Sequence, residues 1–173
     1  MWLTPDDPVR HFGARQVSEH LFIGNAICAV DARGALLLPA FVRATLERRT
    51  DARLILIGSH ETDRCLVAYD PGHAQTLASD CRRRRIAEEA SAPNDHHVRE
   101  RRIFGFVEQV GFDARGAAML PPMMRRRARI DDAALVIGTG GAFEIWNPQL
   151  ALESDDPDLR ELAAFHLDYQ QAA

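Results

Sequence analysis

The sequence predicts an α+β fold, mainly β, in which two copies of one unit form a pseudo-twofold, barrel-like core surrounded by helices. The first observation is a repeated turn: Val-Asp-Ala-Arg-Gly-Ala at 30–35 returns 82 residues later as Phe-Asp-Ala-Arg-Gly-Ala at 112–117. Each copy also follows an apolar run and leads into a Leu-Pro pair, Leu38-Pro39 and Leu120-Pro121. One such unit cannot bury its apolar faces alone, so the repeat indicates two units packed together.

Composition limits the possible partners of the chain. The net charge of −4 is concentrated near the end of the sequence, where residues 151–173 hold six carboxylates and one arginine. Residues 20–150 carry a weak positive charge, which permits a nucleic-acid partner. No apolar run is long enough to span a bilayer and no signal peptide is recognisable, so we expect no membrane partner. The three scattered cysteines indicate reduced thiols in an intracellular protein.

The repeated turn has the chemistry of a tight hairpin. Asp31 can accept backbone N–H bonds, and Gly34 can adopt the left-handed conformation that a bulge requires. Arg33 is then exposed at the tip of a rigid hairpin. By the same argument, Asp113 and Gly116 shape the second tip and Arg115 lies on it.

The remaining elements follow in the same order in both halves. In the first half we expect strands at 21–30 and 35–38, a helix that starts after Pro39 and ends at Arg49, and strands at 54–57 and 65–69. Helices are expected at 73–91 and up to Arg102. In the second half we expect strands at 104–112 and 118–120, a short helix opened by Pro121-Pro122, and strands at 134–137 and 143–146.

These elements divide the chain into five parts. We predict a loose arm at 1–19, a first repeat at 20–72, a helical linker at 73–103, a second repeat at 104–152 and an acidic, partly helical tail at 153–173. Each repeat contains two hairpins with a helix between them.

The duplicated order resembles the MraZ family. The matching segments are 22–25 with 30–34 and 38–43 in the first half, and 111–116, 120–121 and 143–146 in the second. The resemblance covers about residues 20–150 and implies two fused AbrB-type swapped-hairpin units. It implies a cytoplasmic, nucleoid-associated regulator that represses its own promoter and a division and cell-wall gene cluster. It also implies ring-shaped homo-oligomers that bind G-rich repeated boxes in double-stranded DNA.

The residues that the resemblance assigns to DNA lie at the tips and on the helices after the Leu-Pro pairs. Arg33 and Arg115 would contact the groove, and helix arginines would contact phosphates. The expected DNA-binding set is Asp31, Arg33, Gly34, Arg43, Asp113, Arg115, Gly116, Arg125, Arg126 and Arg127. The segment from Arg125 to Arg129 is expected to lie next to the second tip.

The chain departs from the family signature at one position in each repeat. The signature is Asp-x-x-x-Arg, and its final Arg is replaced here by Ala35 and Ala117. A bidentate Arg–guanine pair contributes roughly 1–3 kcal/mol of discrimination, so two such losses could weaken specific binding severely. The alternative function is therefore an oligomeric scaffold or protein-interaction module that has weakened or lost specific DNA binding.

Other motifs do not indicate catalysis. Gly138 to Gly141 lacks the pattern of a nucleotide-binding loop and is typical of a hairpin turn. We interpret the run from Arg82 to Arg85 as a solvated helix face rather than a phosphate contact. The histidines, serines and carboxylates do not form metal-binding or triad patterns. We expect no enzyme activity, cofactor, metal or small-molecule substrate.

Overall fold

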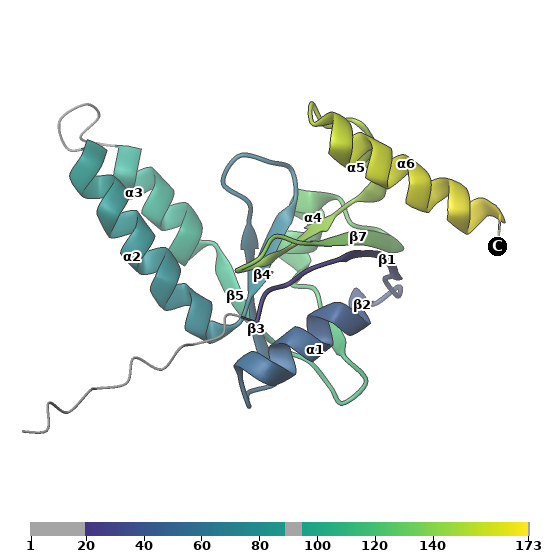
Figure 1. Ribbon diagram of the computed structural model, residues 1–173, viewed down its shortest axis with the longest axis horizontal. Helices are drawn as coiled ribbons and strands as arrows, with labels where there is room; N and C mark the ends of the chain where they lie inside the picture. Colours follow the sequence, from purple (N-terminus) through teal and green to yellow (C-terminus); the bar gives the residue numbers. More distant parts are fainter. Residues whose placement is uncertain (1–19, 89–94, 173) are drawn as a thin grey trace, which may run out of the picture.

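The computed structural model describes residues 20–88 and 95–172 (Figure 1). The elements of the first half are β1 (Asn25–Ala29), β2 (Ala35–Leu37), α1 (Ala40–Arg49), β3 (Leu54–Ser59), β4 (Leu66–Tyr69) and α2 (Pro71–Glu88). Those that follow are α3 (Asp95–Glu100), the π-helix η1 (Arg101–Gly105), β5 (Val107–Gly111), β6 (Ala117–Met119), α4 (Pro122–Ala128), β7 (Ala133–Gly138), β8 (Phe143–Trp146), α5 (Pro148–Leu152) and α6 (Pro157–Ala172). The fold is α+β, as the sequence predicts.

The two halves exchange strands. Six strands form an antiparallel sheet in the order β1-β7-β8-β4-β3-β5, and β2 pairs with β6 in a separate ribbon. Strands β1, β3 and β4 of the first half correspond to β5, β7 and β8 of the second. Exchanging the corresponding strands gives the same order read from the other end. The described strands do not close a barrel, because β1 and β5 are the two free ends of this order. The barrel-like part of the expectation is corrected to an open sheet with a crossing ribbon.

Matching positions of the two halves meet in one core. Leu36, Leu38, Val42 and Leu46 are fully or almost fully buried, and so are the residues 82 positions later, Ala118, Leu120, Met124 and Ala128. The sheet contributes residues such as Ile57 and Phe143 to the same cluster. A shared core of this kind explains why neither half could bury its apolar residues without the other.

Helices extend the molecule on two sides (Figure 1). α2 and α3 lie together as a helical hairpin on one side, and α5 and α6 pack against each other on the other side. Leu159 and Ala163 of α6 pack on Leu135 and Trp146 of the sheet. The strand expected at 104–112 starts later than the sequence predicts. Phe104 lies in η1 and is 46% exposed, so the strand begins at Val107 and not at Phe104.

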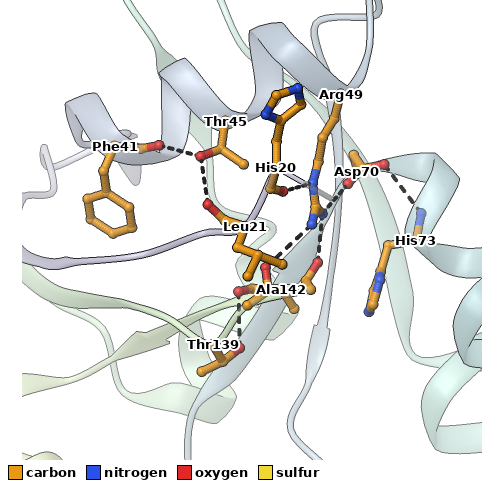
Figure 2. A network of polar contacts seen from close by, with 11 residues as sticks. His20, Leu21, Phe41, Thr45, Arg49, Asp70, His73, Thr139 and Ala142 are labelled. Atoms are coloured by element: carbon orange, nitrogen blue, oxygen red, sulfur yellow. Dashed lines mark hydrogen bonds and ion pairs between the residues drawn. The ribbon is translucent and has the colours of Figure 1, made fainter. Parts of the chain in front are cut away.

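A buried ion pair links the end of α1 to the residue before α2, and its arginine also bonds the start of the described chain and the β7–β8 turn (Figure 2). Arg49, at the end of α1, lies 2.8 Å from the carboxylate of Asp70 and donates to the carbonyl oxygens of His20 and Gly141. Its guanidinium also stacks on the ring of Phe22, 4.6 Å from the centroid. The side chains of Arg49 and Asp70 are only 14% and 7% exposed. In the second half a neutral residue takes the place of Asp70. Asn147 caps the start of α5, as Asp70 accepts a bond at the start of α2.

Candidate nucleic-acid interface

Both repeated turns adopt the same hydrogen-bonded hairpin. In the first, the Asp31 carboxylate accepts from the backbone N–H groups of Arg33 at 2.9 Å and Ala35 at 2.8 Å. In the second, the Asp113 carboxylate accepts from Arg115 at 2.8 Å and Ala117 at 2.9 Å. These bonds hold each tip in one conformation, because the aspartate replaces the missing backbone acceptors of the turn.

The same bonds act on the acidity of the two aspartates. The backbone N–H of Ala35 lowers the pKa of Asp31 below its ordinary value, and that of Ala117 does the same for Asp113. A carboxylate that accepts several N–H bonds is stabilised in its charged form. Both tips therefore keep an ionised aspartate throughout the physiological pH range.

The glycine of each turn is required by its backbone conformation. Gly34 has φ +94° and Gly116 has φ +85°, which are left-handed values that L-residues rarely adopt. A Cβ on Gly116 would lie 2.3 Å from Cδ of Arg43, whereas one on Gly34 would lie 3.2 Å from Nη1 of Arg125. Each glycine thus also lets an arginine of the other half approach the turn.

The ribbon of β2 and β6 links the two tips. Its register pairs Ala35 with Met119 and Leu37 with Ala117, so one tip lies at each end of the three-residue ribbon. Two further bonds of 2.9 Å extend it, from Leu38 N–H to Gly116 and from Leu120 N–H to Gly34. The side chains of Arg33 and Arg115 are exposed.

The helix arginines lie beside the tip of the opposite half. Arg125 donates to the carbonyl of Ala32 in the first tip at 3.5 Å, and Arg43 donates to the carbonyl of Arg115 in the second at 3.4 Å. The expectation that Arg125 and its neighbours lie next to the second tip is therefore wrong. Because β2 pairs with β6, the helix that follows each Leu-Pro pair lies beside the hairpin tip of the other repeat.

The remaining arginines of this region point to different partners. Arg125 also donates hydrogen bonds to the carbonyls of Ile130 at 2.9 Å and Asp131 at 2.7 Å. The guanidinium of Arg127 lies over the ring of Phe106, 5.3 Å from its centroid. Arg126 and Arg129 are exposed and line a hollow beside the first tip. The expected DNA-binding set ends at Arg127, because nothing in the local sequence of Arg129 distinguishes it from its neighbours.

The outer face of the ribbon is apolar. Leu37 is 50% exposed and Met119 44% exposed, whereas Leu36 and Ala118 point into the core. Ala35 and Ala117, where the family signature has arginine, are half-buried members of the same ribbon. This face therefore offers alkyl groups and not guanidinium groups between the two tips.

Within residues 20–88 and 95–172, no three histidine, cysteine or acidic side chains come together as a metal-binding group. None of the helices in these ranges is both long and apolar enough to cross a membrane.

The chain is similar to curated proteins that are named as regulators. A protein of Cytophaga hutchinsonii is 28% identical over 149 residues, which cover 84% of this chain and 94% of the relative. Proteins of Saccharophagus degradans and Syntrophobacter fumaroxidans are 28% and 29% identical over 75% and 73% of the chain, covering 84% and 79% of the relatives. No family model matches the chain. All three relatives are named transcriptional regulator MraZ.

The chain is similar to these transcriptional regulators over most of its length. The matched length spans most of the relatives as well.

Proposed function

We propose that this protein is a sequence-specific, DNA-binding transcriptional regulator that represses its own promoter and a division and cell-wall gene cluster. The observation that carries the proposal is the pair of tips, each with an exposed arginine on a turn fixed by an ionised aspartate. A two-stranded ribbon fits the major groove of B-DNA, which is about 12 Å wide. The relatives named as transcriptional regulators support the same function.

In this proposal the residues of each tip have separate roles. Arg33 and Arg115 contact the bases or the groove edges, and Asp31, Gly34, Asp113 and Gly116 hold the turns in shape. Arg43 and Arg125 are positioning residues, since their guanidinium groups already bond the carbonyls of the opposite tip. Arg126 and Arg127 lie on α4, where exposed cations can contact phosphates.

The assembly and location of the protein are part of the same proposal. We infer two AbrB-type repeats at 20–72 and 104–152, a helical linker at 73–103 and an acidic tail at 153–173. Rings of this chain would engage several G-rich boxes at once, so that weak contacts add through effective concentration. The protein would act in the cytoplasm on the nucleoid. The loose arm expected at 1–19 lies outside the described residues.

The test is a salt-dependent gel-shift titration with the DNA upstream of the chain's own gene and a random duplex of equal length. We expect tighter binding to the upstream DNA, with loss of that preference in Arg33→Ala plus Arg115→Ala. The control Arg82→Ala plus Arg83→Ala removes the same charge from the exposed face of α2 and keeps the preference. Equal affinity for both duplexes, unchanged by the tip variants, would refute the proposal.

A second candidate function follows from the apolar face of the ribbon. Ala35 and Ala117 replace the signature arginines, and Leu37 and Met119 are exposed beside them. An oligomeric scaffold that binds other proteins would use such a face. The variant Ala35→Arg plus Ala117→Arg separates the two functions. Binding to a G-rich repeat by this variant, with none by the unaltered chain, favours the scaffold.

A further inference from the structure

The two tips are alike, but the hollows beside them are not. The first tip adjoins an open hollow of about 580 Å³ between Arg33 and α4, and the second adjoins one of about 290 Å³ between Asp113 and α1. They lie at corresponding places in the two halves, because Arg125 borders one and Arg43, its counterpart 82 residues earlier, borders the other.

The charged residues that line the two hollows have net charges of opposite sign. The described lining of the first contains four arginines and one aspartate, namely Arg33, Arg125, Arg126, Arg129 and Asp131. That of the second contains two arginines and three carboxylates, namely Arg43, Arg53, Glu47, Asp51 and Asp113. The difference comes from α1 and α4, because Ala44 and Glu47 of α1 correspond to Arg126 of α4 and to Arg129, which directly follows α4. We call these the basic hollow and the mixed hollow.

Arg129 occupies a backbone position that normally favours glycine. It follows the last residue of α4 with φ 53° and ψ 40°, and among the described residues no other non-glycine has a positive φ. The bonds from Arg129 N–H to Arg126 and from Ile130 N–H to Arg125 form a Schellman ending, where glycine is the usual residue. A long cationic side chain is thus kept in the basic hollow in a disfavoured backbone conformation.

The basic hollow also has cations that are free to bind an anion. Within the described ranges, no carboxylate forms an ion pair with Arg126 or Arg129, and both side chains are exposed. Arg125 also lines this hollow, where its guanidinium donates to the carbonyls of Ile130 and Asp131. In the mixed hollow, Glu47 and Asp51 would instead repel a phosphate.

We propose that the basic hollow is the phosphate-binding site of this protein and that the two tips engage duplex DNA unequally, the first tightly and the second weakly. The proposal rests on the DNA-binding function proposed above and specifies its site. A backbone phosphate lies between Arg126 and Arg129 while Arg33, on the same hollow, reaches the groove. Arginine suits this role because its planar guanidinium binds phosphate through two N–H groups.

The experiment measures binding of the full chain to a random-sequence duplex of 40 base pairs as a function of salt concentration. Each phosphate contact contributes about 0.9 to the slope of log affinity against log salt. Arg126→Ala plus Arg129→Gly is expected to lower the slope by about 1.8 and the affinity by at least about tenfold. Arg48→Ala plus Arg53→Ala removes one exposed arginine from α1 and one from the lining of the mixed hollow, and it is expected to leave the slope unchanged.

A gain-of-function variant makes the test independent of damage to the basic hollow. Ala44→Arg plus Glu47→Arg copies the α4 pattern onto α1 and is expected to increase the slope. Equal slopes for the two loss variants, or no gain from the α1 variant, would overturn the unequal engagement while leaving DNA binding intact. No binding of the unaltered chain to any duplex at low salt would instead refute the proposed function itself.

Discussion

The first and second hairpin tips have the same turn and different surroundings. Their four turn residues are identical, their aspartates make the same bonds, and their glycines have similar φ angles. The first tip nevertheless lies beside the arginines of α4, and the second beside the carboxylates of α1 and the following loop. The turn therefore sets the shape of each tip, whereas the helix of the other repeat sets the charge beside it.

The largest expected effect concerns the buried ion pair between Arg49 and Asp70 of the first half, whose counterpart in the second half is the neutral cap Asn147. Arg49→Met is expected to lower the free energy of unfolding by about 3–5 kcal/mol, because it leaves the buried Asp70 carboxylate without its cation. The matched change in the second half, Asn147→Ala, removes a neutral helix cap and should cost about 1 kcal/mol. Urea unfolding followed by circular dichroism measures both. Equal losses would show that the two junctions do not differ in the way the structure indicates.

The next effect compares the two turn glycines. Gly116→Ala is expected to cost about 2–4 kcal/mol, because its Cβ would meet Arg43 Cδ and the backbone has a positive φ. Gly34→Ala should cost about 1–2 kcal/mol, since its Cβ meets only the flexible end of Arg125. Urea unfolding of the two variants gives the difference.

A double variant identifies the cause of that difference. Adding Arg43→Ala to Gly116→Ala removes the atom that the Cβ meets, so the cost should fall to that of Gly34→Ala. A cost that stays the same in the double variant would show that the backbone conformation alone is responsible.

A smaller effect of opposite sign is expected at the end of α4. Arg129→Gly is expected to raise the free energy of unfolding by about 1 kcal/mol, because glycine adopts the left-handed conformation without strain. The same variant should weaken DNA binding. Thermal unfolding and the salt titration measure the two quantities, with Arg126→Ala as a control that weakens binding without stabilising the fold. Destabilisation by Arg129→Gly would mean that its side chain serves the fold and not a ligand.

The smallest effect is one in which the tips should behave alike. Because the pKa values of Asp31 and Asp113 are lowered in the fold, their bonds stabilise it above the ordinary carboxyl pKa. That stabilisation is lost as the pH falls through the lowered pKa values. The N–H resonances of Ala35 and Ala117 should therefore shift together on acidification, below about pH 4, where free aspartates titrate. Asp31→Asn plus Asp113→Asn should remove the shift, and titration of one tip alone would contradict the equality of the turns.

Local patterns in the sequence predict most of the elements, because hairpin tips and helix starts depend on neighbouring residues. The helix after Pro39 begins and ends as expected, and the turn at 31–34 has the expected bonds. Phe104 and Phe106 imitate the alternation of a strand, but the chain is still helical at Phe104. The spacing of apolar residues alone cannot distinguish the last turn of a helix from the start of a strand.

The pairing of each tip with a helix could not be predicted from local sequence. Arg125 follows the second tip in the chain and bonds to the first, because β2 and β6 exchange the two repeats. Arg49 and Asp70 are likewise far apart in sequence and meet only through the tertiary fold. The backbone of Arg129 gives no sequence signal either, since glycine would be expected at that position.

The most direct test of the account is photo-cross-linking from single cysteines placed in the two tips. Ala32→Cys and Ala114→Cys each carry an exposed thiol for a cross-linking label, and the native thiols compete poorly because burial raises their pKa values, that of Cys28 to about 11. With a duplex from the upstream region, the account predicts a cross-link yield several times higher from position 32 than from position 114. Equal yields, or a higher yield from position 114, would contradict the assignment of the first tip as the main contact with DNA.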